Sequence, residues 1–135
     1  QIYKRAQILV ADIWACFEGI GFGHFKDIDD ITMFADYRVP QMLAYCGVLV
    51  YSPELLQLMQ NKVLIQHDDP KEVEIRGCSI WAVELIKQEL SKLRISKPNL
   101  PINSIIIDFY LWDYAKLHSA SMQHIPIHRT RTIFY

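Results

Sequence analysis

The sequence lacks an excess of charge of either sign. Lysine and arginine together number 14, aspartate and glutamate number 15, and the formal net charge is −1. A protein that binds duplex DNA or RNA usually carries a basic excess or a basic stripe, because it has to neutralise phosphates. The balance of charge therefore argues against a nucleic-acid-binding protein and favours one that binds a small molecule.

Cysteine and long apolar runs are also scarce. Cys16, Cys46 and Cys78 lie far apart, and none belongs to a C-x-x-C pair, so we expect three reduced, mostly buried thiols rather than disulfides. No apolar run approaches the roughly 20 residues that a membrane-spanning helix needs, and no signal-peptide pattern is seen. We expect an intracellular, cytoplasmic protein that does not associate with membranes.

The usual motifs for a metal ion or a bound nucleotide cofactor are missing. The five histidines form neither an H-x-x-x-H pair on one helix nor an H-E-x-x-H motif, because Pro126 separates His124 from His128. The glycine cluster at 19–23 lacks the Lys-Ser/Thr of a phosphate-binding P-loop. We predict no metal site and no cofactor.

The residues that are present indicate a globular, mainly helical protein. Half of the sequence is hydrophobic (51%) and 21% is charged, which is typical of one domain with a real core. Helical spacing predicts a first helix over 2–17 and short helices over 30–37 and 40–47. The expected buried face of the first helix consists of Ala6, Leu9, Val10, Ile13, Trp14 and Phe17.

Capping residues predict where the later helices begin. Ser52-Pro53 is a helix entry, Asp69 with Glu72 is a capping box, and Asn103 caps a last helix that reaches about Ser119. At Gly77 both a break between two helices and a tolerated glycine are possible. The expected inner face beyond it consists of Ile80, Trp81, Leu85, Ile86 and Leu90.

We therefore expect an all-α protein of six or seven helices. Residues 1–135 would form a single helical domain, and the C-terminal tail would be extended.

Asp108 lies in a run that is apolar or aromatic on both sides, and Asp113 follows it. At least one of the two should point inward, and a buried carboxylate must be paired, protonated or used. Asp108 and Trp112 share a helix face, whereas Asp113 is about 140° away from Asp108, so the two aspartates are not an acid pair. The alternative is a buried salt bridge with Arg5, Arg38 or Arg76.

A second acidic position lies among apolar residues, at Asp36. Phe34 and Asp36 are two apart on a predicted helical turn, on adjacent faces. They offer an aromatic plane for stacking and a carboxylate that accepts ring N–H donors or steadies a cation. From the sequence alone the favoured alternative is a core Phe34 and a surface pair between Asp36 and Arg38.

Several strings carry a resemblance to a known family. They lie at residues 3–9, 25–28, 31–41, 72–79, 102–104, 108–115 and 128–131. Together they resemble the queuosine-salvage family of queuosine 5′-phosphate N-glycosidases/hydrolases over nearly the whole chain. The resemblance implies a fold related to the helix-hairpin-helix DNA glycosylases. It also implies that queuine is released for reuse in tRNA modification, without metal or cofactor.

The resemblance also implies that this chain is the C-terminal part of a longer protein. Family members are longer at the N-terminus, so part of the pocket, including a base-contacting histidine, is expected upstream of Gln1.

On this resemblance Asp36 is the catalytic carboxylate, either as a nucleophile or as a stabiliser of an oxocarbenium-like ribosyl cation. Phe34 would stack on the deazaguanine base. The aspartates of the last helix would bind the base edge or its protonated amine arm, and the basic residues would bind the 5′-phosphate. The expected substrate-binding residues are Phe34, Asp108, Trp112, Asp113, Arg38 and Lys4, with Arg5 as a further phosphate ligand.

The expected partner is thus a small nucleotide, without a stable nucleic-acid complex. The alternative is a non-catalytic nucleic-acid-binding or scaffold module with a glycosylase-like fold. Its expected basic stripe near Gly77 is missing, because Arg76 stands nearly alone there. Hydrolysis of a different nucleotide in the same pocket is a second alternative.

Overall fold

The computed structural model describes residues 2–93 and 102–133. These residues form α-helices and two short 3-10 helices, and they contain no β-strand, which confirms the all-α prediction. The helices are α1 (Lys4–Cys16), η1 (Gly21–Gly23), η2 (Ile28–Asp30), α2 (Arg38–Tyr45), α3 (Pro53–Gln60), α4 (Pro70–Leu93) and α5 (Ser104–Leu117). No helix within the described ranges is long and apolar enough to cross a membrane.

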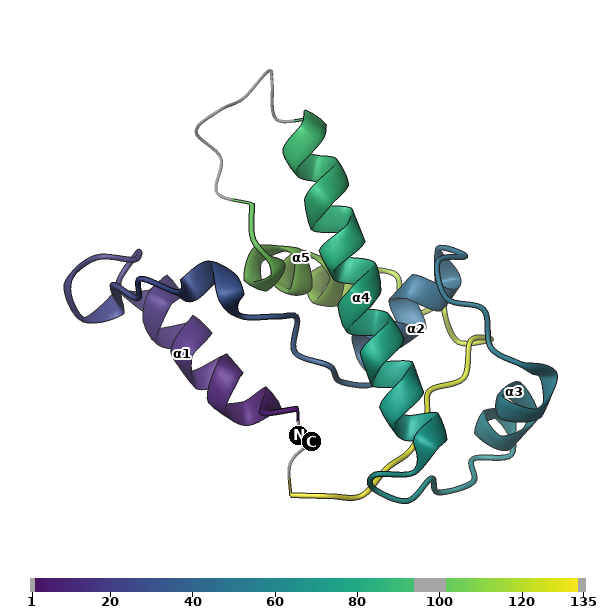
Figure 1. Cartoon of the computed structure of the whole chain (residues 1–135). Coiled ribbons are helices and arrows are strands. Elements are labelled where there is room, and N and C mark those ends of the chain that lie inside the picture. The colour runs from purple at the N-terminus through teal and green to yellow at the C-terminus, as the bar shows by residue number, and fades with distance from the viewer. Residues whose placement is uncertain (1, 94–101, 134–135) are drawn as a thin grey trace.

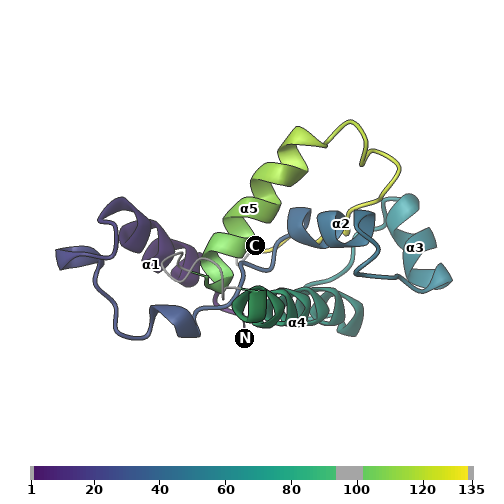
Figure 2. The same ribbon diagram turned by 90° about the horizontal axis from the view of Figure 1, so that it is seen from above.

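Helices α2, α4 and α5 pack together at the centre, and α1 and α3 lie on opposite sides of them (Figure 1; Figure 2). The central core draws on all three helices and on the segment before α2: Met33, Ala35, Val39, Leu43, Ala82, Val83 and Ile107. A smaller cluster beneath α3 consists of Leu55, Met59, Ile65 and Ile75.

The predicted helix starts are confirmed. Ser52 Oγ accepts a hydrogen bond from Leu55 N (3.2 Å), and Asn103 Oδ1 accepts one from Ile106 N (3.1 Å). Asp69 Oδ1 accepts from Lys71 N at 2.8 Å. The expected capping box is wrong in one respect, because Glu72 is fully buried and pairs with an arginine one turn later.

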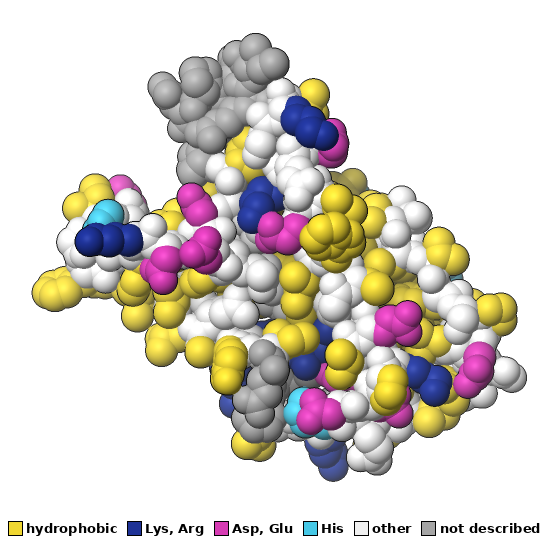
Figure 3. Space-filling model, viewed as in Figure 1, with side chains coloured by type: hydrophobic (Ala, Val, Ile, Leu, Met, Phe, Trp, Pro, Cys, Tyr) yellow, Lys and Arg dark blue, Asp and Glu magenta, His cyan; other side chains and the backbone are white. Residues whose placement is uncertain are grey.

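The expected inner face of α4 is confirmed for Ile80 and Ile86, which pack against the central core, and wrong for the other three residues. The helix continues through Gly77, so the glycine is tolerated, but Trp81 is 62% exposed and Leu85 and Leu90 are exposed as well. Figure 3 shows hydrophobic side chains on the outer surface over α4. The buried positions of α4 include the small residues Ser79, Ala82 and Val83, which allow α2 and α5 to approach closely.

Two further expectations about burial are wrong, the first of them in part. Trp14 packs against a core cluster, as expected. In α1 the buried residue is Ala11, whereas Leu9 is 61% exposed. All three cysteines are free but exposed: Cys78 lies on the outer side of α4, and Cys16 and Cys46 lie at helix ends. Hydrophobic character alone therefore does not identify the buried face of these helices.

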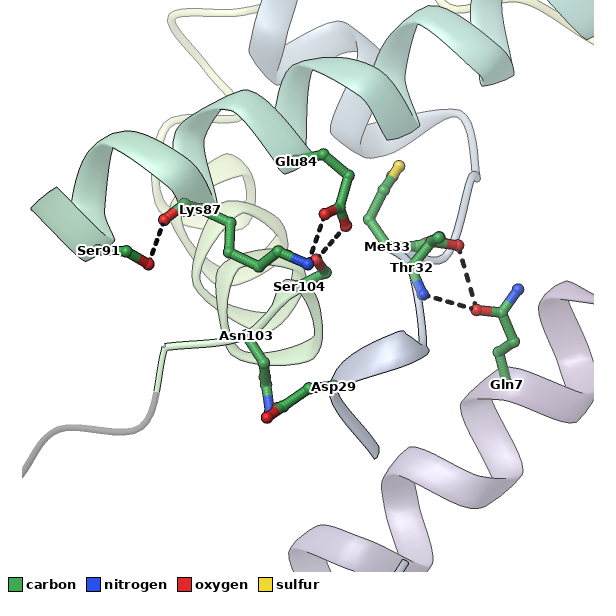
Figure 4. Close-up of polar contacts among 9 residues, drawn as sticks. All are labelled: Gln7, Asp29, Thr32, Met33, Glu84, Lys87, Ser91, Asn103 and Ser104. Atoms are coloured by element: carbon green, nitrogen blue, oxygen red, sulfur yellow. Dashed lines mark hydrogen bonds and ion pairs between the residues drawn. The ribbon is translucent and has the colours of Figure 1, made fainter. Parts of the chain in front are cut away.

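The segment 31–36 is extended, although the sequence predicted a helix there. Gln7 Oε1 of α1 accepts from Thr32 N at 3.0 Å in its first part (Figure 4). Just before the segment, Asn103 Nδ2 donates to Asp29 Oδ1 of η2 at 3.3 Å. The segment does not form helical hydrogen bonds because buried side chains of other elements take its backbone groups. Within the described residues the C-terminal tail is non-helical over 126–132, as expected, and Ile65 N donates to Arg129 O in it at 2.8 Å.

The tolerated glycine gives a test of this fold. A Cβ at Gly77, in the interior of α4, would meet nothing within 4 Å. We expect Gly77→Ala to raise the free energy of unfolding in urea by about 0.5–1 kcal/mol, because glycine costs a helix conformational entropy. As the matched control, Gly23→Ala should lower it, because the new Cβ would lie 2.7 Å from Phe17 Cβ. A loss of stability in Gly77→Ala would contradict a continuous α4.

Candidate active site

Two buried side chains hold the extended segment from opposite sides. Phe34 N donates to Asp108 Oδ2 of α5 at 2.9 Å. Arg76 Nε of α4 donates to Ala35 O at 3.1 Å, and its Nη1 pairs with Glu72 Oε1 at 2.8 Å. Asp108 is 5% exposed, Arg76 3% and Glu72 0%. The backbone next to Asp36 is thus fixed by charged groups from two different helices.

The Asp36 carboxylate is fixed by the start of α2. Its Oδ1 accepts from Arg38 N at 2.8 Å and from Val39 N at 2.9 Å. These are backbone donors at a helix N-terminus, where negative charge is stabilised. Because side chains two apart in an extended segment point to the same side, Phe34 and Asp36 line one pocket instead of adjacent helix faces.

This pocket has a volume of ≈ 460 Å³ and gathers six of the eight predicted site residues. It is lined by Lys4, Ile8, Phe34, Asp36, Asp108, Phe109, Trp112 and Asp113. The sequence prediction missed Ile8, which follows Lys4 by one helical turn and could have been found from that spacing. It also missed Phe109, whose ring centroid lies 6.0 Å from that of Phe34.

Arg5 and Arg38 are the two predicted site residues that do not line this pocket. Arg5 lines an adjoining pocket. Arg38 lies apart from both. Its Nη1 donates to Gln41 Oε1 at 2.9 Å, and its side chain lines a different pocket near Arg129. Arg38 still acts on Asp36 through its backbone N–H. The sequence alternative holds in one part, because Phe34 is 5% exposed and belongs to a core cluster. Its other part, a surface pair between Asp36 and Arg38, does not hold, because Asp36 is only 8% exposed.

The α5 residues line the pocket as their spacing predicts. Asp108 points inward, as expected of a carboxylate in an apolar run, and Trp112 one turn later shares its side of the helix. Asp113 is exposed and reaches the same pocket from another angle. Lys116 Nζ lies 3.5 Å from the centroid of the Trp112 ring. The pocket therefore has an apolar floor with one buried and one exposed carboxylate on α5.

Neither buried aspartate is explained by a salt bridge to arginine. Arg76 pairs with Glu72, and no arginine within residues 2–93 and 102–133 forms an ion pair with Asp36 or Asp108. In the same part of the chain, Asp36 Oδ2 and Asp108 Oδ1 accept no hydrogen bond. Each carboxylate thus has one oxygen fixed by backbone donors and one that no described donor occupies.

The two carboxylates differ in electrostatic surroundings. Burial raises the pKa of Asp108 to about 7; the Asp36 charge adds to this rise, and the Phe34 N–H and Lys4 oppose it. Burial also raises the pKa of Asp36, but two backbone N–H groups, Lys4 and Arg38 all oppose the rise. More groups oppose the rise at Asp36 than at Asp108, so the surroundings favour the proton on Asp108 over Asp36.

A second pocket of ≈ 320 Å³ adjoins the first at Lys4, which lines both. Arg5 and Arg76 also line it, together with Asp68 and Glu72, and Arg76 is paired with Glu72. Burial lowers the pKa of Lys4, and the charge of Asp36 opposes that effect. The junction of the two pockets is suited to an anion held beside the Asp36 carboxylate.

Within the described ranges, one group of side chains has ligand atoms close enough for a metal ion. Atoms of His67, Asp68 and Glu72 lie within 4.8 Å of one another, an arrangement that a search for histidine spacing alone does not detect. The Arg76 guanidinium already binds Glu72 Oε1. A metal ion there would sit next to a fixed positive charge, which opposes its binding.

Comparison with known proteins identifies relatives of this chain. Residues 1–135 match the family described as "Queuosine salvage protein". The chain is 55% identical to "Queuosine 5′-phosphate N-glycosylase/hydrolase" of Mus musculus over 135 residues, which covers 98% of this chain and 40% of the mouse protein. The protein of the same name from Schizosaccharomyces pombe is 49% identical over 141 residues, which covers 98% of this chain and 39% of the relative.

A bacterial relative of the same name, from Sphaerobacter thermophilus, is 40% identical over 135 residues, which covers all of this chain and 40% of the relative. The chain thus spans about two-fifths of the length of the curated relatives it matches. The family match, in contrast, extends over every residue of the chain. This chain belongs to the queuosine salvage protein family.

Proposed function

We propose that this chain supplies the catalytic carboxylate and much of the base-binding pocket of an enzyme that hydrolyses queuosine 5′-phosphate to queuine and ribose 5-phosphate. The observation that carries the proposal is the single pocket that gathers Asp36, Asp108 and Phe34. Relatives that are 40–55% identical to this chain share the name "Queuosine 5′-phosphate N-glycosylase/hydrolase", which also supports the proposal. The alternative of a non-catalytic scaffold does not explain two buried carboxylates at one pocket.

Asp36 is the group that meets the positive charge at the anomeric carbon. Cleavage of a glycosidic bond develops an oxocarbenium-like cation, and a fixed carboxylate stabilises it or attacks it. Two backbone N–H donors hold Oδ1 of Asp36, so the carboxylate is oriented before the substrate arrives. Its Oδ2, which accepts no hydrogen bond from described residues, is the oxygen that faces the reacting carbon.

The aromatic lining binds the base. Phe34 and Phe109 lie with their rings tilted at 50°, and Trp112 lines the same pocket, so a flat heterocycle stacks against an apolar floor. Asp108 binds the edge of the base. Asp113 is exposed and is the better placed of the two to bind the protonated amine arm, which extends away from the ring.

The 5′-phosphate binds where the two pockets meet. Lys4 lines both, and Arg5 lines the second, so an anion there is attracted by two positive charges. Arg38 is left out of this role because its side chain lies in a different pocket and binds Gln41. In this arrangement Arg5 and Lys4 bind the phosphate, Asp36 lies at the ribose, and Phe34 stacks on the base.

Residues 1–135 form one helical domain of this enzyme, as its C-terminal part, with a glycosylase-like helical fold. It needs no cofactor or metal, works in the cytoplasm, and binds its nucleotide substrate without a stable nucleic-acid complex. The mixed surface charge of the chain, net −1, supports a small substrate over a polymer.

The catalytic assignment is tested in the full-length protein. Asp36→Asn should reduce release of queuine from queuosine 5′-phosphate, measured by mass spectrometry, by at least about 100-fold, because the amide cannot balance the ribosyl cation. Asp27→Asn, at an exposed position outside the pocket, is the control and should retain full activity. Equal activity of Asp36→Asn and the control would rule out the catalytic role.

Binding of the amine arm is tested by comparing two substrates. Asp113→Asn should raise KM for queuosine 5′-phosphate and leave KM for a 7-deazaguanosine 5′-phosphate without the arm unchanged. The expected change is about 10-fold, because a hydrogen bond to a charged group contributes about 1.5–3 kcal/mol. If both KM values rose equally, Asp113 would not be the residue that recognises the arm.

Phosphate binding is tested by a charge deletion on α1. Lys4→Met should raise KM for queuosine 5′-phosphate by about 10-fold or more and change KM for queuosine much less, because only the phosphate pairs with the ammonium group. Lys26→Met, at an exposed loop position, is the matched control. An equal rise for nucleotide and nucleoside would place the phosphate elsewhere.

A further inference from the structure

The leaving group of the proposed reaction poses a chemical problem. When the C1′–N9 bond breaks, its electron pair stays on the base. An ordinary purine eases this step by accepting a proton at N7, but a 7-deazapurine has carbon at that position. The departing base is then a pyrrole-type anion, which is a poor leaving group, so an acid must donate a proton to it at another atom.

Asp108 has the geometry of such an acid. Its Oδ2 accepts the Phe34 N–H at 2.9 Å, and its Oδ1 accepts no hydrogen bond from residues 2–93 or 102–133. A protonated carboxyl keeps its carbonyl oxygen as the acceptor and carries the proton on the other oxygen. In this arrangement the backbone fixes the acceptor oxygen, and the proton lies on the oxygen available to the pocket.

The hydrogen bond also links the acid to the base-binding residue. The N–H that holds Asp108 belongs to Phe34, whose ring lines the pocket. Asp36 lines it as well, two residues further along the same extended segment. A base stacked on Phe34 therefore lies beside Asp108, and its ribose lies beside Asp36.

Burial and the charge of Asp36 favour the protonated form of Asp108, and Lys4 opposes it. From α1 Lys4 faces it, from the extended segment Asp36, and from α5 Asp113, whereas Arg76 of α4 lies behind the backbone of Ala35. Burial raises the pKa of Asp108 to about 7, and the neighbouring Asp36 charge adds to the rise. Two carboxylates whose surroundings separate their proton affinities are a recurrent basis for acid and base roles.

We propose that Asp108 is the general acid that protonates the departing base, while ionised Asp36 stabilises or attacks the ribosyl cation. This inference rests on the proposed function. The C1′–N9 bond breaks with its electron pair on the base, and the Asp108 proton passes to a ring nitrogen of that base. Water adds its oxygen to C1′ and gives up one proton, which restores the proton on Asp108. The products are queuine and ribose 5-phosphate.

The test uses the full-length protein and two substrates that differ in leaving group. The first is queuosine 5′-phosphate and the second is p-nitrophenyl β-D-ribofuranoside 5-phosphate, whose nitrophenolate leaves without a proton. Asp108→Asn should lose at least about 100-fold in kcat on the first substrate and less than about 5-fold on the second. Asp36→Asn should lose heavily on both. Equal losses of Asp108→Asn on the two substrates would overturn the acid role.

The wild-type protein alone gives a second readout, which serves if Asp108→Asn does not fold. A protonated Asp108 is needed, so kcat/KM for queuosine 5′-phosphate should fall as the pH rises through about 7, where the group loses its proton. The nitrophenyl substrate should show no such decline. A decline of the same size for both substrates would contradict the proposal. Absence of queuine release from wild-type protein at every pH would instead refute the proposed function itself.

Discussion

The hydrogen bonds that hold the backbone of residues 34 and 35 are the constraint on which the site depends. Asp108 accepts the N–H of Phe34, and Arg76 donates to the carbonyl of Ala35. Arg76 is held in turn by Glu72, and that pair is almost completely buried. Removal of one member of a buried ion pair leaves an uncompensated charge and costs several kcal/mol. The position of Asp36 is therefore set by side chains of α4 and α5 as much as by its own segment.

This constraint explains why the segment is extended and why that matters for the site. A helix over 31–36 would engage its N–H and C=O groups internally and would turn Phe34 and Asp36 toward different directions. The extended backbone instead exposes one N–H and one C=O to buried partners and places both side chains on one side. The extended segment leads directly into α2, whose first N–H groups orient the Asp36 carboxylate.

The sequence allowed some of this to be predicted. The inward position of Asp108 followed from the apolar run around it, and the caps at Ser52 and Asn103 marked helix starts correctly. The conformation of 31–36 could not be predicted locally, because its decisive hydrogen bonds join residues 41 and 74 positions apart. The prediction that Trp81 of α4 is buried was wrong for a related reason. Close packing between helices selects small side chains on the inner face of α4, so Trp81 stays outside.

The sharing of Lys4 between two pockets couples phosphate binding to the state of the carboxylates. Lys4 lowers the proton affinity of both Asp36 and Asp108. Burial in turn lowers the pKa of Lys4 itself. A phosphate bound to Lys4 would bring negative charge toward both carboxylates and would raise their proton affinity. Two backbone N–H groups oppose protonation of Asp36, whereas one opposes protonation of Asp108, so Asp36 keeps the lower proton affinity of the two. On the proposed roles, the phosphate would thus help to keep the acid protonated while the carboxylate that meets the ribosyl cation stays ionised.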